Sequence, residues 1–215
     1  MGGKNIHIGL VGNPNSGKSS LFNCLTGMNQ KVGNFPGVTV EMKVGEAKID
    51  ENLRAEFLDL PGTYSLYPRR TDEMVTYDVL MNEEHPEHPD ILVVIADAAN
   101  LKRNLLFVSQ IIDLKIPTVV VLTMMDLARK KGVEIDVAGL ERELGVPVVP
   151  VNPRKNKGVL QLKKILTQLS NNLSQSNIRN FVPSANWGKG TVQAIKEKLP
   201  QLSDYKALHL AMNYT

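Results

Sequence analysis

The sequence GNPNSGKS at residues 12–19 constrains the fold more than any other feature of the chain. It matches the pattern GxxxxGK[ST], in which glycines let consecutive backbone N–H groups wrap around a pyrophosphate. An apolar run at residues 6–11 precedes it, and a helical pattern at residues 17–27 follows. This strand–loop–helix context predicts a phosphate site at a helix N-terminus, with Lys18 bridging two phosphates and Ser19 Oγ binding Mg²⁺.

Short β-branched runs alternate with helical patterns through most of the chain. Strands are predicted at residues 40–49, 53–58, 91–96, 118–122 and 146–151, and helices at residues 71–81, 101–114, 133–144 and 159–169. The runs at 91–96 and 118–122 are continuously apolar, as in parallel strands buried on both faces. The pattern predicts an α/β fold with an open, mostly parallel sheet flanked by helices, which binds ligands at the carboxyl ends of its strands.

The composition changes after residue 169. Residues 170–190 are rich in Ser, Asn, Gly and Pro and are predicted to be a linker, followed by helices at residues 191–199 and 203–212. We therefore expect a nucleotide-binding domain at 1–169 and a short all-helical segment at 170–215. The last predicted helix stops on its apolar face.

The net charge of +3 conceals a difference between the two parts of the chain. Residues 1–152 carry 15 Lys and Arg against 20 Asp and Glu, a net of −5, whereas residues 153–215 carry 10 against 2, a net of +8. A basic segment favours anionic neighbours such as nucleic acid or a lipid surface, or it is a solvated helix face. The single cysteine excludes a disulfide framework, and no apolar run reaches the roughly 18 residues that span a bilayer.

Two further loops are candidates for sensing a γ-phosphate. DLPG at residues 59–62 ends a predicted strand, where Asp59 can hold Mg²⁺ through water and the Gly62 N–H can reach the phosphate. Thr39 follows a Gly- and Pro-bearing loop at residues 33–36 and could offer its hydroxyl to Mg²⁺, or be an ordinary residue at a strand start. Many proteins with this loop place glutamine after the glycine, but here Thr63 is too short to orient the attacking water. Catalysis must then use a backbone group, a bound cation or a partner.

TMMD at residues 123–126 follows the predicted strand at 118–122 and is a candidate base reader. The Asp126 carboxylate can accept hydrogen bonds from the N1–H and 2-amino groups of guanine, and adenine lacks this pair of donors. Alternatively, Asp126 caps the helical segment that follows it.

Taken in order, GNPNSGKS, GVTVE, DLPG and TMMD resemble the N-terminal G domain of FeoB-type ferrous iron transport proteins. The segments NFPGVTVE, DLPGTYSL and ILVVIADAANLKRNL are also close to that family, and the resemblance covers residues 6–169. It implies a P-loop GTPase fold and hydrolysis of GTP to GDP at the cytoplasmic face of the bacterial inner membrane. It further implies a transport domain in the same parent chain and a helical domain that tunes nucleotide release. Because the last helix stops on its apolar face and the family's chain continues into the membrane, we expect this chain to be a fragment of a longer protein. A homo-oligomer is compatible with this interpretation, and no nucleic acid partner is expected.

The resemblance also implies K⁺-assisted hydrolysis, in which Asn15 helps to hold K⁺ beside the phosphates and replaces the charge of an arginine finger. The expected catalytic residues are Asn15, Lys18, Thr39 and Gly62, and the Mg²⁺ ligands are Ser19, Thr39 and Asp59. Arg69 and Arg70 are expected to be solvated. The expected nucleotide-binding residues are Gly12, Asn13, Pro14, Asn15, Ser16, Gly17, Lys18, Ser19, Ser20, Gly37, Val38, Thr39, Asp59, Gly62, Thr123, Met124, Asp126, Leu127, Asn152, Pro153 and Arg154.

Two positions depart from the family pattern. Thr123 stands where asparagine ties the base loop to the phosphate loop, and Pro153 stands where a backbone N–H binds guanine O6. The O6 contact must then come from Arg154 or Lys155, or be absent, and we expect weak affinity with rapid exchange. Two alternatives remain open: a GTPase associated with RNA or the ribosome, and a guanine-nucleotide-binding module with negligible hydrolysis.

Overall fold

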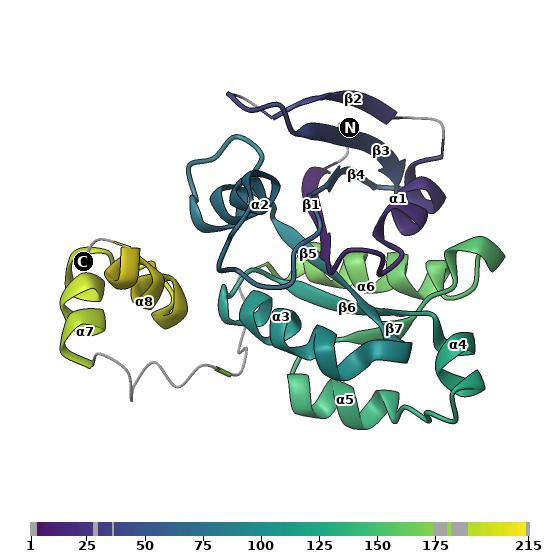
Figure 1. The fold of residues 1–215 in the computed structure, drawn as a ribbon. Helices are drawn as coiled ribbons and strands as arrows, with labels where there is room; N and C mark the ends of the chain where they lie inside the picture. The colour runs from purple at the N-terminus through teal and green to yellow at the C-terminus, as the bar shows by residue number, and fades with distance from the viewer. Residues whose placement is uncertain (1–3, 28–29, 36, 174–179, 182–188, 214–215) are drawn as a thin grey trace.

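The computed structural model describes residues 4–27, 30–35, 37–173, 180–181 and 189–213. Within these ranges seven strands form one sheet in the order β2-β3-β4-β1-β5-β6-β7 (Figure 1). The strands are β1 (Lys4–Gly12), β2 (Gln30–Asn34), β3 (Glu41–Lys48), β4 (Leu53–Asp59), β5 (Ile91–Asp97), β6 (Thr118–Thr123) and β7 (Val148–Pro150).

The sheet is parallel from β4 through β1, β5 and β6 to β7, and antiparallel where β3 pairs with β4 and with β2. This confirms the predicted mostly parallel sheet. The register sets Leu10 opposite Asp59, and Asp97 opposite Thr123. The carboxyl ends of four strands therefore meet along one edge of the sheet, which is where the candidate site lies.

Helices cover both faces of the sheet and bury its apolar side chains in two layers (Figure 1). α1 (Lys18–Thr26) and α6 (Val159–Asn171) cover one face, and α2 (Thr71–Met81), α3 (Leu101–Asp113) and α5 (Val137–Leu144) cover the other. The continuous apolar run of β5 serves both layers, because alternate side chains of a strand point to opposite faces. Val93 packs in the layer with α1, and Val94 packs in the layer with α3.

Short helical segments complete the edge that carries the strand ends. They are η1 (Ala98–Asn100), α4 (Met125–Lys130) and η2 (Pro153–Lys155). Each directly follows a strand or lies within three residues of one, and α4 and η2 contribute residues to the candidate site.

The last two helices, α7 (Lys189–Lys198) and α8 (Asp204–Asn213), lie beyond α2 and α3 (Figure 1). Tyr205 of α8 is buried in the same apolar layer as α3, and Lys206 Nζ lies 2.9 Å from Glu83 Oε1. Both helices lie within two residues of their predicted ranges. Most of the predicted linker at 170–190 lies outside the described residues. Among the residues that are described, no helix combines the length and apolar character needed to cross a bilayer.

Two elements differ from the predictions. β2 was not expected, because the Gly- and Pro-bearing sequence at residues 33–36 indicated a loop, but it pairs with β3 as an edge strand. α5 begins at Val137 and not at residue 133, because the Asp136 side chain accepts a hydrogen bond of 2.8 Å from the Gly139 N–H. That interaction caps a helix N-terminus and fixes where the helix starts.

Candidate nucleotide-binding site

The phosphate loop lies between the end of β1 and the start of α1, as the motif predicts. Gly17 caps α1 with a left-handed φ of 92°, and Asn15 also has a positive φ of 63°. The loop lines a cavity of about 550 Å³, together with Gly62, Arg70 and Arg154. Backbone N–H groups at a helix N-terminus, next to an open cavity, are an arrangement that can bind an anion, as the motif predicts.

Three polar atoms are buried in this loop without a hydrogen-bond partner among the described residues. They are both amide atoms of Asn13 and the Ser16 hydroxyl. Buried polar groups are nearly always paired in native proteins, and exceptions concentrate at functional sites. The unpaired groups therefore support a functional role for this loop.

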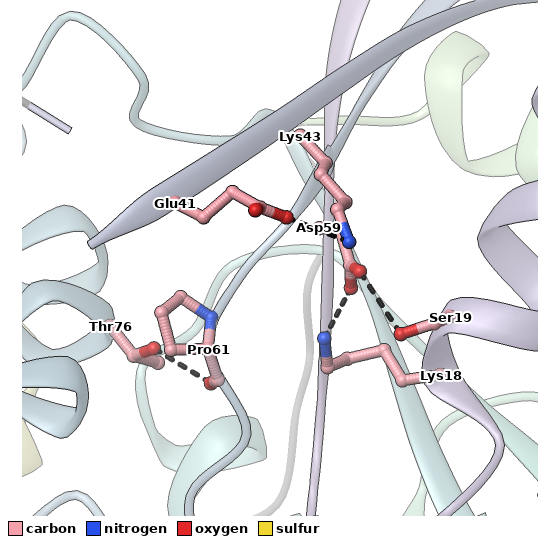
Figure 2. Close-up of polar contacts among 7 residues, drawn as sticks. All are labelled: Lys18, Ser19, Glu41, Lys43, Asp59, Pro61 and Thr76. Carbon is pink, nitrogen blue, oxygen red and sulfur yellow. Dashed lines mark hydrogen bonds and ion pairs between the residues drawn. The ribbon is translucent and has the colours of Figure 1, made fainter. Parts of the chain in front are cut away.

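Lys18, Ser19 and Asp59 meet at the floor of the site (Figure 2). Lys18 Nζ forms an ion pair with Asp59 Oδ1, and Ser19 Oγ lies 3.3 Å from Asp59 Oδ2. Asp59 is 8% exposed and comes from the end of β4, so the sheet register positions its carboxylate under the loop. A cation, a hydroxyl and a carboxylate thus converge on one point from residues 40 positions apart in the sequence.

The DLPG loop is fixed against the phosphate loop by its backbone. The Thr63 N–H donates to the Gly12 carbonyl at 3.2 Å, and the Thr76 hydroxyl of α2 donates to the Pro61 carbonyl at 2.9 Å (Figure 2). Thr63 is buried, and its hydroxyl donates to the Ser65 carbonyl at 2.8 Å. The side chain at position 63 is therefore engaged away from the cavity, which agrees with the expectation that Thr63 does not orient water.

A second cavity of about 280 Å³ adjoins the first and holds the candidate base-reading residues. Asp126 and Leu127 line it from the start of α4, Gly17 lines it from the phosphate loop, and Ser20 lines it from the first turn of α1. Met124 has a left-handed φ of 55°, which turns the chain between β6 and α4. Asp126 lies at the surface of this cavity, and its Oδ1 accepts a hydrogen bond from the Leu127 N–H at 3.1 Å. This hydrogen bond joins Asp126 to its neighbour in the chain and uses only Oδ1 of the carboxylate.

Thr123 keeps the tie between the base loop and the phosphate loop. It is 2% exposed, and its hydroxyl donates to the Ser16 carbonyl at 2.6 Å. The hydroxyl thus makes a connection that the family pattern assigns to an asparagine amide.

Asn152, Pro153 and Arg154 line the far wall of the second cavity. The Asn152 side chain accepts a hydrogen bond of 3.2 Å from the Lys155 N–H, which closes the η2 turn. The Lys155 N–H is therefore engaged within the η2 turn. Arg154 is exposed and lines both cavities, so it is the better placed of the two expected O6 donors.

The structure does not bring every expected residue to the cavities. Residues 37–39 line neither of them, and Thr39 is exposed. Val38 instead packs against the apolar layer that contains α2 and α3. A contact from Thr39 to nucleotide or Mg²⁺ stays a prediction.

The residues present fit the two cations that the sequence implies. The Ser19 hydroxyl and the Asp59 carboxylate are hard oxygen donors close together, and Mg²⁺ is commonly held by one or two carboxylates with phosphate and water oxygens. Asn15 is exposed on the first cavity and carries an amide oxygen, which suits a hard monovalent ion.

Two basic residues near the site are not among the expected site residues. Lys43 of β3 is opposite Asp59 in the β3–β4 register, and its ion pair with Glu41 (2.8 Å) raises its pKa, with a smaller contribution from Asp59 (Figure 2). Arg70 was expected to be solvated; it is exposed, but it also lines the phosphate cavity. The antiparallel pairing of β3 with β4 would have placed Lys43 beside Asp59, had it been known. Nothing in the local sequence indicates that Arg70 lies at the cavity.

Comparison with known proteins agrees with this geometry. A family model described as ferrous iron transport protein B matches residues 6–166. The Fe(2+) transporter FeoB of Leptospira biflexa is 46% identical over 165 residues, which cover 77% of this chain and 23% of that protein. The Fe(2+) transporter FeoB of Escherichia coli (strain K12) is 35% identical over 197 residues, which cover 92% of this chain and 25% of that protein. The chain thus spans about a quarter of the length of these curated relatives.

Solved structures show the same fold. The cytosolic domain of L. pneumophila FeoB is 37% identical, with a TM-score of 0.81 over 94% of this chain and 78% of that chain. A GDP-bound point mutant of the S. thermophilus FeoB G-domain is 38% identical, with a TM-score of 0.82 over 95% of this chain and 78% of that chain. The chain therefore has the P-loop GTPase fold, and it belongs to the ferrous iron transport protein B (FeoB) family.

Proposed function

We infer that this chain binds GTP and GDP with Mg²⁺ and hydrolyses GTP, as the cytoplasmic nucleotide-binding part of a bacterial ferrous iron transporter. The convergence of Lys18, Ser19 and Asp59 beneath the phosphate loop carries this proposal. Lys18 would bind the β- and γ-phosphates, and Ser19 and Asp59 would hold Mg²⁺. In this proposal residues 1–169 are the G domain, and residues 170–215 begin a helical domain between it and a transport domain at the inner membrane.

Guanine would occupy the second cavity, with Asp126 accepting hydrogen bonds from its N1–H and 2-amino groups. Arg154 would contact O6 in place of the N–H that Pro153 lacks. The Thr123–Ser16 hydrogen bond supports this assignment, because it holds the base loop and the phosphate loop in a fixed relation.

The test of base recognition is the Asp126→Ala variant. We expect it to bind GTP and GDP about 100-fold more weakly, because two hydrogen bonds to a charged acceptor are lost. Its preference for GTP over ATP should disappear as well. Fluorescent-nucleotide titration measures both quantities.

Glu134→Ala is the matched control, since it removes an exposed carboxylate in the loop that follows α4 without touching either cavity. It should bind nucleotides as the wild type does. If Asp126→Ala retains wild-type affinity and preference, the guanine assignment is wrong.

Potassium is the second element of the proposal, with Asn15 as its ligand. A cation beside the phosphates would supply the charge that Thr63 cannot, and GTP turnover should be at least about tenfold faster in K⁺ than in Na⁺. Asn15→Ala should remove this difference while Mg²⁺-dependent GDP binding persists. Equal turnover in both salts would exclude K⁺ assistance, and no turnover in either would indicate a binding module without hydrolysis.

A further inference from the structure

Lys43 of β3 faces the Asp59 carboxylate across the β3–β4 pair (Figure 2). The two residues are directly opposite each other in the antiparallel register, so their side chains lie on the same face of the sheet. Glu41 lies two residues before Lys43 on the same strand and therefore shares that face. Two carboxylates thus flank the Lys43 ammonium, Glu41 on its own strand and Asp59 on the neighbouring strand.

The ion pair between Lys43 and Glu41 is exposed to solvent. Lys43 Nζ lies 2.8 Å from Glu41 Oε1, and the two side chains are 39% and 57% exposed. This pair raises the pKa of Lys43, and the charge of Asp59 raises it further. Lys43 is therefore a stable cation that already interacts with Asp59 through space. Because an exposed ion pair contributes little to stability, the ammonium can shift towards Asp59 at small cost.

Asp59 has a partner in this structure that nucleotide binding would remove. Lys18 forms an ion pair with Asp59, and in the proposed function Lys18 turns to the β- and γ-phosphates. Asp59 is only 8% exposed, and a buried charge without a partner is costly, so its carboxylate then requires another positive charge. Mg²⁺ and the Lys43 ammonium both meet that requirement.

We propose that Lys43 is a positioning residue that competes with Mg²⁺ for the Asp59 carboxylate. This inference rests on the proposed function, in which Asp59 holds Mg²⁺ beside the nucleotide. The ammonium attracts the carboxylate and repels the divalent ion, so it lowers the Mg²⁺ affinity of the nucleotide complex. It also balances the charge of Asp59 when a nucleotide is bound without metal, which lessens the dependence of nucleotide binding on Mg²⁺.

The test is the Mg²⁺ dependence of GDP binding in the 215-residue chain, with Lys43→Gln compared to Lys48→Gln. Both variants remove one lysine charge from β3, but Lys48 is exposed and lies opposite Arg54, away from the site. Titration of fluorescent GDP at a series of Mg²⁺ concentrations gives the Mg²⁺ affinity of the GDP complex. Lys43→Gln should bind Mg²⁺ about fivefold more tightly, and its Kd for GDP without Mg²⁺ should rise about threefold. Lys48→Gln should keep both wild-type values.

Two further variants separate the charge of Lys43 from the shape of its side chain. Lys43→Arg keeps the charge and should retain the wild-type Mg²⁺ affinity within about twofold. Glu41→Gln removes the other carboxylate that attracts Lys43, so Mg²⁺ affinity should fall about threefold, opposite in sign to Lys43→Gln. Raising NaCl from about 0.05 M to about 0.5 M should shrink both effects, because salt screens exposed charges.

The outcomes distinguish the role of Lys43 from the function on which it rests. Unchanged or weaker Mg²⁺ binding in Lys43→Gln, or an equal gain in Lys48→Gln, would overturn the competition. If the wild type binds GDP equally well with and without Mg²⁺, the proposed Mg²⁺ site at Asp59 fails, and this inference fails with it. If the wild type depends on Mg²⁺ but the variants match it, the proposed function stands and only the role of Lys43 is rejected.

Discussion

At the scale of single residues, Gly62 sets how closely the DLPG loop approaches the phosphate loop. A Cβ at this position would lie 3.2 Å from the backbone nitrogen of Pro14 and 3.3 Å from its Cα. Backbone atoms cannot rotate away as a flexible side chain can. We expect Gly62→Ala to push the two loops apart and lower kcat for GTP at least about tenfold, since the Gly62 N–H, the proposed donor to the γ-phosphate, would be displaced.

Steady-state turnover and GDP titration measure this effect. GDP affinity should change little, because the phosphate loop is the proposed source of the β-phosphate contacts. Gly33→Ala is the control, since a Cβ on Gly33 meets no atom within 4 Å. Wild-type turnover in Gly62→Ala would show that the close approach has no role in hydrolysis.

The residues of the site differ in how far the sequence could predict them. Lys18, Ser19 and Asp59 belong to short motifs at strand ends, and a parallel sheet necessarily brings strand ends together, so their convergence follows from local pattern. Arg70 depends instead on the path of the segment before it, which is set by hydrogen bonds to Gly12 and Gln110. Those partners are distant in sequence, and no local pattern encodes them.

At the scale of helices and strands, the predictions were correct where a single sequence pattern, such as a continuous apolar run, determined the element. The continuous apolar runs of β5 and β6 identified buried strands, and their alternate side chains fill both layers. β2 was missed because its residues are mostly exposed and its strand character comes from pairing with β3. An edge strand of this kind is stabilised by its neighbour, so its own composition carries little signal.

Helix α8 docks through a histidine enclosed by aromatic rings. The His209 ring lies 4.6 Å from Tyr67, 4.7 Å from Tyr205 and 5.8 Å from Tyr77, measured between ring centroids. Burial lowers the pKa of His209 to about 4. Its Nε2 has no hydrogen-bond partner within the described ranges. The neutral ring is therefore the form that packs against the segment after DLPG.

This burial predicts a pH-dependent stability. The folded pKa lies below the ordinary value near 6.5, so the unfolded chain binds more protons, and stability falls as pH drops from about 6.5 towards 4. At pH 5 the loss is at most about 2 kcal/mol, and Tm should fall by about 4–8 °C relative to pH 7.5.

His209→Phe keeps an aromatic ring and removes the titrating group. Thermal unfolding followed by circular dichroism at both pH values should show a smaller drop for this variant than for the wild type. His7→Phe, at a partly exposed position on β1, is the matched control and should keep the wild-type drop. An equal drop in His209→Phe and the wild type would assign the acid sensitivity to other groups.

At the scale of the whole molecule, the charge difference between the two parts of the chain acquires a structural meaning. The basic C-terminal part places Lys206 against Glu83, and Lys206 is 3% exposed. Part of the positive charge therefore faces the acidic N-terminal part and not an external anion. The charge of each part can be counted from the sequence, but the ion pair between Lys206 and Glu83 depends on how α8 packs.

The docking of α8 predicts that the C-terminal part stabilises the rest of the molecule. Tyr205 is 3% exposed in the layer that contains α2 and α3, and Phe181 packs against that layer while its N–H binds Asp113 Oδ1 at 2.8 Å. A chain that ends at residue 173 would expose the apolar surface that these rings cover. We expect its free energy of unfolding to fall by about 3 kcal/mol, and its Tm by about 6–12 °C.

Calorimetry of the shortened and the 215-residue chains measures this difference, and Tyr205→Ala in the longer chain separates packing from chain length. If packing is the cause, Tyr205→Ala should reproduce a large part of the loss while α7 and α8 remain attached. Because Tyr67 contacts His209 and lies after the DLPG loop, both changes should also alter the rate of GDP release in stopped-flow experiments. Equal Tm values for the two chains would show that α8 contributes no stability, and the coupling from α8 to the nucleotide would lose its structural basis.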